Sequence, residues 1–165
     1  MNKETATILI GYALVYAYLF FHVFVHELGH YLAAKAFNFK INKLRIGMGP
    51  TLVKWGAVSV NIIPLSGGAD IEETPDKYPK QYIVIAASGV ALNVSVALVL
   101  NWMWWRSPPE NMFLCYASLI VFSLLYSDIT NFLPLRDRQG NMSDGGVILA
   151  CLQDLRKTPI LMGDK

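Results

Sequence analysis

Residues 6–37 read ATILIGYALVYAYLFFHVFVHELGHYLAAKAF, and this apolar stretch decides the class of fold. Its ionisable interruptions are His22, His26, Glu27, His30 and Lys35. The stretch exceeds the roughly 20 residues needed to cross a hydrocarbon core. It is also too long for the core of a signal peptide, which has about 7 to 15 apolar residues. It therefore predicts a transmembrane helix.

The composition of the whole chain also indicates a membrane protein. Of 165 residues, 54% are hydrophobic and 16% are charged, and the mean hydropathy is +0.38. Residues 81–105 and 112–133 form two more apolar stretches that are long enough to cross a bilayer. We therefore expect a mainly α membrane protein with three transmembrane helices, forming one membrane-embedded domain over residues 1–165.

Charge and cysteine content exclude two other classes of protein. The net charge of +2 does not provide the basic face that a nucleic-acid binder needs to neutralise phosphates. Cys115 and Cys151 have neither the number nor the spacing of a disulfide framework or a Cys-x-x-Cys metal site. Both are predicted to be packing residues. The oligomeric state is not predictable from the sequence.

The basic residues predict an orientation in the membrane. Twelve of the 14 Lys and Arg residues fall between the first two predicted spans or after the third. They are Lys35, Lys40, Lys43, Arg45, Lys54, Lys77, Lys80, Arg136, Arg138, Arg156, Lys157 and Lys165. Only Lys3 and Arg106 fall on the other side. Because basic residues favour the cytosolic side, we expect the N-terminus outside and the C-terminus in the cytosol.

The connection over residues 41–68 is predicted to form a small β segment beside the membrane. Residues 41–55 and 57–63 are rich in β-branched and aromatic residues, and glycines and a proline interrupt them. Pro64 to Gly68 is expected to end the second strand. The segment could be an ordinary hairpin, or its edge near residues 58–63 could accept another chain by strand addition.

The chemistry concentrates in His26-Glu27-Leu28-Gly29-His30. Residues four apart share one helix face, so both imidazoles can reach one zinc ion while Glu27 deprotonates a water molecule. A polar cluster packed between helices is the structural alternative, but such groups are costly at membrane depth unless they are used. His26 comes about 30 Å along the helix from Ala6, which predicts a site near the cytosolic boundary.

A catalytic zinc ion needs a third protein ligand. His22 shares the face of His26, but about 12 Å along the axis separates it from His30, which favours a role in lining the site over ligation. Asp144 is the better candidate. It is predicted to be the N-cap of a helix over residues 144–156, where Gly145 and Gly146 allow close backbone approach. Capping alone would also explain Asp144.

Together these motifs resemble the site-2 proteases, which are peptidase family M50. The matching positions are His26, Glu27 and His30; Gly89 and Asn93; Asn131, Pro134, Asp144 and Gly145; and the β segments at 46–52 and 62–68. The resemblance covers about residues 8–155. It implies a zinc metalloprotease with Zn²⁺ held by His26, His30 and Asp144, and with catalytic roles for Glu27 and Asn93.

Two features depart from the family pattern. The spacing from Asn131 to Asp144 is longer than usual, so Asp128 and Asp137 compete as the third ligand. The sequence contains no PDZ or nucleotide-binding accessory domain, which suggests a minimal form that acts on a short peptide or a small protein. Gly89 and Asn93 could instead serve only helix packing.

The resemblance implies an endopeptidase that cleaves a membrane-anchored protein or peptide within the lipid bilayer, near its cytosolic side, in a bacterial cytoplasmic membrane. The alternative is a catalytically silent membrane protein that binds peptides or partner proteins on the same scaffold. Glu27 argues against this alternative, because a structural zinc site has no need of a general base. The substrate and any regulatory partner are not predictable from the sequence.

Overall fold

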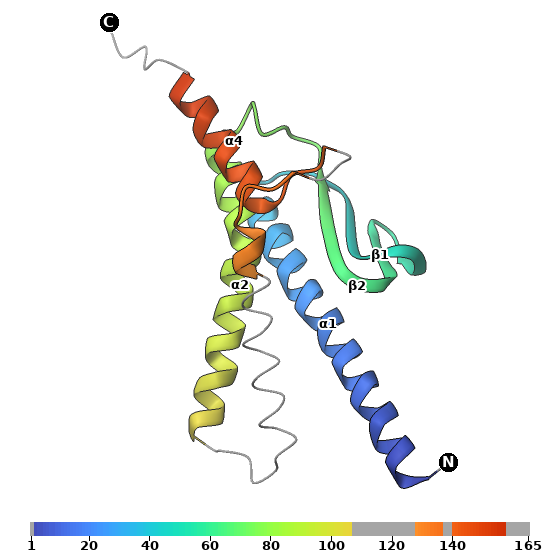
Figure 1. Cartoon of the computed structure of the whole chain (residues 1–165). Helices are drawn as coiled ribbons and strands as arrows, with labels where there is room; N and C mark the ends of the chain where they lie inside the picture. Colours follow the sequence, from blue (N-terminus) through green and yellow to red (C-terminus); the bar gives the residue numbers. More distant parts are fainter. Residues whose placement is uncertain (1, 107–127, 137–139, 158–165) are drawn as a thin grey trace, which may run out of the picture. The chain divides into compact units, whose positions relative to one another are not determined.

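The computed structural model describes residues 2–106, 128–136 and 140–157. The chain divides into two compact units, residues 1–72 and 73–165, and each is described by itself. The first contains helix α1 and strands β1 and β2, and the second contains helices α2 and α4 (Figure 1). The described part is thus mainly helical. Its two strands come between α1 and α2 in the sequence.

Helix α1, Lys3–Ala36, is continuous through the His-Glu-x-x-His motif. The side chain of Asn2 caps its N-terminus by accepting a hydrogen bond from the backbone N–H of Thr5 (2.7 Å). Its buried residues lie in its C-terminal half: Val23, Val25, His26, Glu27, Gly29, His30 and Ala34. The N-terminal half exposes large apolar side chains, as a helix surrounded by lipid would.

The C-terminus of α1 is fixed by a left-handed residue. Asn38 has φ +59°, and its N–H donates to the carbonyl of Lys35, while the N–H of Phe39 donates to that of Ala34 (both 2.9 Å). This is the Schellman arrangement, in which asparagine takes the position usually held by glycine. It stops the helix and turns the chain directly into the first strand.

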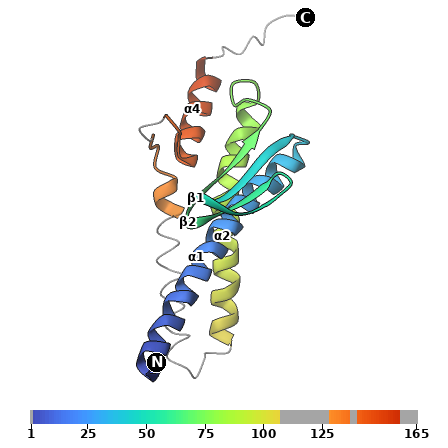
Figure 2. The same ribbon diagram turned by 90° about the vertical axis from the view of Figure 1, so that its right-hand side faces the viewer.

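Strands β1, Ile41–Trp55, and β2, Val58–Ile71, form the sheet of the first unit and pack against α1. The turned view in Figure 2 shows the two strands as long, strongly curved ribbons. The hydroxyl of Tyr16, in the first half of α1, donates to the carbonyl of Ile62 in β2. The hairpin therefore extends along the helix well before the His-Glu-x-x-His motif.

The register shows that β1 and β2 each consist of two segments with different pairing partners. Residues 44–46 pair with 67–69 and also with 58–60, while residues 53–55 pair with 58–60 from the other side. The order across the sheet is therefore 67–71, 41–46, 58–60 and 51–55. Gly47 and Gly49 permit this folding-back, because both have positive φ (+84° and +81°), a conformation that costs glycine little.

Two expectations for the β segment are wrong. The Pro64–Gly68 stretch does not end β2, which continues to Ile71 because residues 67–71 return to pair with the start of β1. Pro64 is tolerated because it lies where the register shifts and no ladder donor is needed. Residues 58–60 are not a free edge, since they are paired on both sides. Among the described strands, the outer segments are 67–71 and 51–55.

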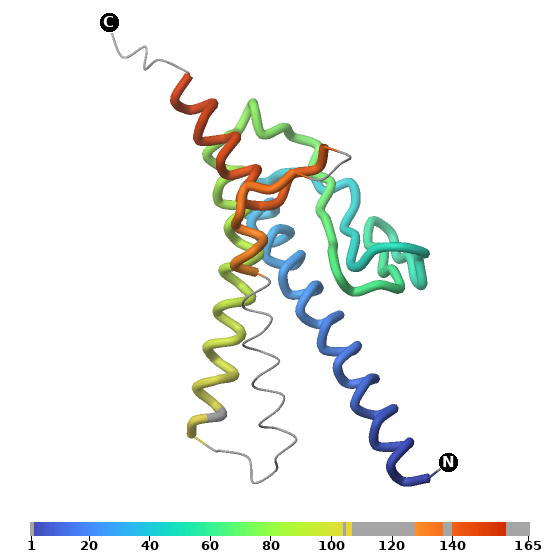
Figure 3. Tube along the Cα trace, viewed as in Figure 1, coloured from blue at the N-terminus to red at the C-terminus, as the bar shows by residue number. Residues whose placement is uncertain are grey.

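The second unit contains α2, Pro79–Arg106, and α4, Asp144–Lys157, which pack together. The tube in Figure 3 follows residues 128–136 into the turn that precedes α4. Residues 128–131 are helical and the chain turns at Phe132. The third predicted span, residues 112–133, otherwise lies outside the described residues.

Two of the described helices have the length and hydropathy of membrane spans, α1 and α2. Only 11% and 33% of their most apolar windows are buried within the protein, so neither resembles the fully covered core helix of a soluble domain. These helices agree with the predicted spans at 6–37 and 81–105.

Cys151 of α4 is a packing residue, as predicted, with 1% of its surface exposed. Burial raises the pKa of its thiol, and the negative charge of the nearby Asp154 raises it further. The neutral thiol is therefore favoured. Cys115 lies outside the described residues.

Candidate metal centre

His26 and His30 point their Nε2 atoms at each other from successive turns of α1, 3.1 Å apart. Their rings are inclined at 82°, and both residues are 8% exposed. In a tetrahedral site with zinc–nitrogen bonds of about 2.0 to 2.1 Å, two nitrogens lie roughly 3.3 Å apart. The pair is therefore arranged to bind one ion, as the four-residue spacing predicts.

Glu27 lies about 100° around the helix from His26 and is 4% exposed. Its side chain lies against Gly67 of β2. A carboxylate in this position, next in sequence to a candidate metal ligand, has the placement expected of a general base. Gly67 was not predicted as a functional residue. The available signal was the Gly67-Gly68 pair, which as a sequence pattern indicates only the end of a strand.

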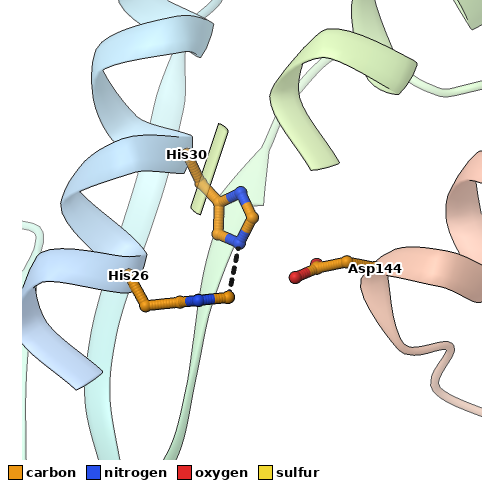
Figure 4. Close-up of side chains that lie close together, drawn as sticks. All are labelled: His26, His30 and Asp144. Atoms are coloured by element: carbon orange, nitrogen blue, oxygen red, sulfur yellow. Dashed lines mark hydrogen bonds between the residues drawn. The ribbon is translucent and has the colours of Figure 1, made fainter. Parts of the chain in front are cut away.

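Asp144 is the first residue of α4 in the second unit. Asn131 donates a hydrogen bond from Nδ2 to the Asp144 carboxylate oxygen Oδ2 (2.8 Å). This bond fixes the orientation of the carboxylate and joins the two ends of the Asn-x-x-Pro…Asp-Gly motif across the long spacing. Figure 4 draws the three candidate ligands, His26 and His30 on α1 and Asp144 on α4.

The prediction that Asp144 is the N-cap is wrong by one residue. Ser143 is the cap, since its Oγ accepts from the N–H of Gly146 (3.2 Å), and it also donates to the carbonyl of Leu133 (2.5 Å). Because Ser143 supplies the cap, the Asp144 carboxylate is not needed for capping, and capping no longer explains Asp144.

Gly145 and Gly146 do allow close backbone approach, as predicted. A Cβ on Gly145 would overlap the backbone carbonyl of Phe132, and one on Gly146 would lie 3.0 Å from the carbonyl oxygen of Leu135. The absence of side chains therefore lets the first turn of α4 sit directly on the segment that carries Pro134. This packing holds Asp144 next to Asn131.

Asp128, a rival for the metal, is occupied elsewhere in the same unit. Asn93 of α2 donates from Nδ2 to Asp128 Oδ1 (3.2 Å), and the two residues are 6% and 3% exposed. Asp128 and Asn131 are three residues apart on one helical turn, so this turn binds α2 through one residue and α4 through the other.

The other candidates have different outcomes. His22 lies on α1 one turn before His26 and is half-buried. It is not part of the candidate group of metal ligands. Asp137, the second rival of Asp144, lies outside the described residues.

A His-Glu-x-x-His helix with convergent imidazoles and a buried glutamate between them defines the site of a metal-dependent peptidase. Residues 14–131, more than half of the chain, match the family described as peptidase family M50. The chain belongs to this family.

The names of two similar proteins include zinc as the metal. Proteins of Fusobacterium nucleatum and Chlamydia trachomatis are each named a "Putative zinc metalloprotease". The first is 33% identical over 92 residues, which cover 47% of this chain and 27% of the relative. The second is 31% identical over 139 residues, which cover 68% of this chain and 22% of the relative.

The matches thus cover about a quarter of the length of these relatives. No solved structure matches the chain. Zinc is the metal that the family implies, and the convergent imidazoles of His26 and His30 suit it.

Proposed function

We propose that this chain is an intramembrane zinc endopeptidase that cleaves membrane-associated peptides or proteins near the cytosolic side of the bilayer. The observation that carries the proposal is the convergence of His26 and His30, 3.1 Å apart at Nε2, beside the buried Glu27. A binding protein could use the histidines, but it would have no use for the buried carboxylate of Glu27, which is costly to desolvate.

We propose His26, His30 and Asp144 as the zinc ligands. Two imidazoles and one carboxylate are a donor set of catalytic zinc sites, which keep a fourth position open. The hydrogen bond from Asn131 supports this assignment for Asp144, because ligating carboxylates are usually oriented by such a partner. When bound, zinc would polarise the scissile carbonyl and make a water molecule more acidic.

The residues of the chain then have distinct tasks. Glu27 takes the proton of the attacking water and returns it to the leaving amine. Asn93 is proposed to hydrogen-bond the substrate backbone or its developing oxyanion through the amide that now donates to Asp128. His22, one turn before the ligands, lines the approach along α1.

An extended substrate is required, because the amides of a helix are already hydrogen-bonded and shielded. A sheet edge can hold such a segment by adding it as a further strand. Among the described strands, residues 67–71 offer an outer edge that begins at Gly67, in contact with Glu27. We propose this edge as the docking strand, in place of residues 58–63.

The decisive experiment combines metal analysis with a cleavage assay. The purified protein is expected to contain about one zinc per chain and to cut at least one of a panel of co-expressed single-span membrane peptides. Removal of zinc by a chelator should abolish cleavage, and added Zn²⁺ should restore it. A zinc-loaded protein that binds peptides but never cuts them would support the silent binding protein instead.

The proposed topology places the N-terminus outside and the C-terminus in the cytosol. It rests on the asymmetry of twelve Lys and Arg residues against two. Fusions of a reporter that is active only outside the membrane should be active after Lys3 and Pro109 and inactive after Lys165. Green fluorescent protein at the same positions should give the opposite pattern. Cytosolic fluorescence from the Pro109 fusion would refute the arrangement.

A further inference from the structure

We infer that Gly67 is a positioning residue for the general base: its missing side chain creates the space that the Glu27 carboxylate occupies. The inference rests on the proposed function, since it concerns the residue assigned to move the proton. The contact lies within the first unit, between β2 and α1, and joins positions 40 residues apart in sequence.

The geometry leaves no room for a larger residue. A Cβ built on Gly67 would lie 2.5 Å from both Cγ and Cδ of Glu27 and would overlap its carboxylate oxygen Oε1. Glu27 is 4% exposed, so its side chain cannot swing into open space to relieve the overlap. An alanine at position 67 must therefore displace the carboxylate, the helix or the strand.

The strand is the least able to move. Gly67 pairs with Ile46 in the ladder, and its carbonyl accepts from the guanidinium of Arg45 (3.4 Å). Ile46 is buried on the adjoining segment. Because ladder and core hold the Gly67 backbone, the cheapest response to an added methyl group is a shift of the Glu27 side chain away from its position.

Backbone conformation does not explain why residue 67 is glycine. Gly47 and Gly49 have positive φ, where other residues are strained, whereas Gly67 does not. Its conformation is open to any L-residue. The closest contacts that a side chain at position 67 would make are all with Glu27, so its substitution is a probe of that contact.

Gly68 is a matched control. It is the next residue of the same strand, it also lacks a positive φ, and a Cβ there would meet only the end of the Arg45 side chain at 3.6 Å, an ordinary contact. Gly67→Ala and Gly68→Ala thus add the same methyl group to neighbouring positions of one strand. Only the first reaches the proposed base.

The experiment measures kcat, KM, bound zinc and thermal unfolding for both variants, with and without a change at Glu27. Gly67→Ala should bind zinc normally and keep KM within about twofold, while kcat falls roughly 10- to 100-fold, the range expected when a catalytic group is displaced by about an ångström. Gly68→Ala should match the unchanged protein in bound zinc and thermal unfolding. Any loss of cleavage that both variants share belongs to the proposed docking strand, so only the additional fall in kcat of Gly67→Ala reports on Glu27.

A double-mutant cycle separates positioning from general damage to the fold. Adding Gly67→Ala to Glu27→Gln should slow residual cleavage by less than about twofold, because the base it displaces is already absent. In thermal unfolding, Gly67→Ala should lower Tm in the unchanged background but not with Glu27→Ala, which vacates the space. This second readout requires no activity.

Three results would overturn the inference: full kcat in Gly67→Ala, an equal loss in the Glu27→Gln background, or the same fall in Tm with and without Glu27→Ala. Failure of the proposed function looks different. In that case the unchanged, zinc-loaded protein cuts none of the peptides, while the unfolding cycle still reports the contact between residues 67 and 27.

Discussion

Glu27→Gln is expected to bind zinc as the unchanged protein does and to cleave peptides at least about a hundredfold more slowly, the lower end of the effect of a general base. Glutamine keeps the size and shape of the side chain, so the contact with Gly67 is preserved. It cannot accept the proton of the attacking water, so the loss should fall on kcat. Uncut substrate should remain bound and be recovered with the variant.

The matched control is Glu4→Gln, which removes the same charge from the first turn of the same helix. Glu4 is exposed and about 22 residues before the motif, so this variant should retain full activity. Zinc content, KM and kcat are measured for both variants. Turnover at the unchanged rate in Glu27→Gln would show that another group moves the proton.

Asp144→Ala is expected to lose bound zinc and all zinc-dependent cleavage. Two imidazoles alone hold zinc weakly, because a catalytic site draws three ligands from the protein. The substitution leaves the first turn of α4 intact, since Ser143 supplies the cap. Loss of metal should therefore occur without loss of the folded protein, which thermal unfolding in chelator can verify.

Asp128→Ala and Asp137→Ala are the controls, because both residues compete for the same role in sequence. Both variants should keep zinc at one ion per chain. Asp128→Ala removes the acceptor of the Asn93 amide, so any loss of activity there should appear with the metal still bound. Normal zinc content in Asp144→Ala would assign the third ligand to another residue.

Helices α1 and α2 and the convergence of His26 and His30 were predictable because each depends on local spacing. Hydropathy over about 20 residues predicts a span, and the four-residue interval between His26 and His30 predicts that the imidazoles converge. Both α1 and α2 lie within a few residues of the predicted boundaries. The approach of Gly145 to the preceding segment was also predictable, since adjacent glycines indicate close backbone contact.

The sheet and its contact with the motif were not predictable, because they depend on pairing between distant residues. Alternation of residue types gives strands but not their partners, so the double pairing of residues 44–46 has no local signal. The contact between Gly67 and Glu27 joins two elements that only the folded hairpin brings together. The predicted cap, Asp144, was one residue from the actual cap, Ser143, because aspartate and serine are both favoured N-cap residues and the sequence does not distinguish them.

The hydrogen bond from Tyr16 to Ile62 has a consequence for how this protein would choose what it cuts. Tyr16 precedes His26 by ten positions, or about 15 Å along the helix, so in the proposed orientation the hairpin reaches into the hydrocarbon layer. Unpaired backbone groups of the hairpin at that depth have no water to bind. These groups should therefore pair with a substrate segment whose own backbone has already lost its helical hydrogen bonds. Selection would then depend on how easily a membrane segment unwinds, so that glycine, proline or asparagine in a span would mark it for cleavage more than any particular side chain at the cut bond.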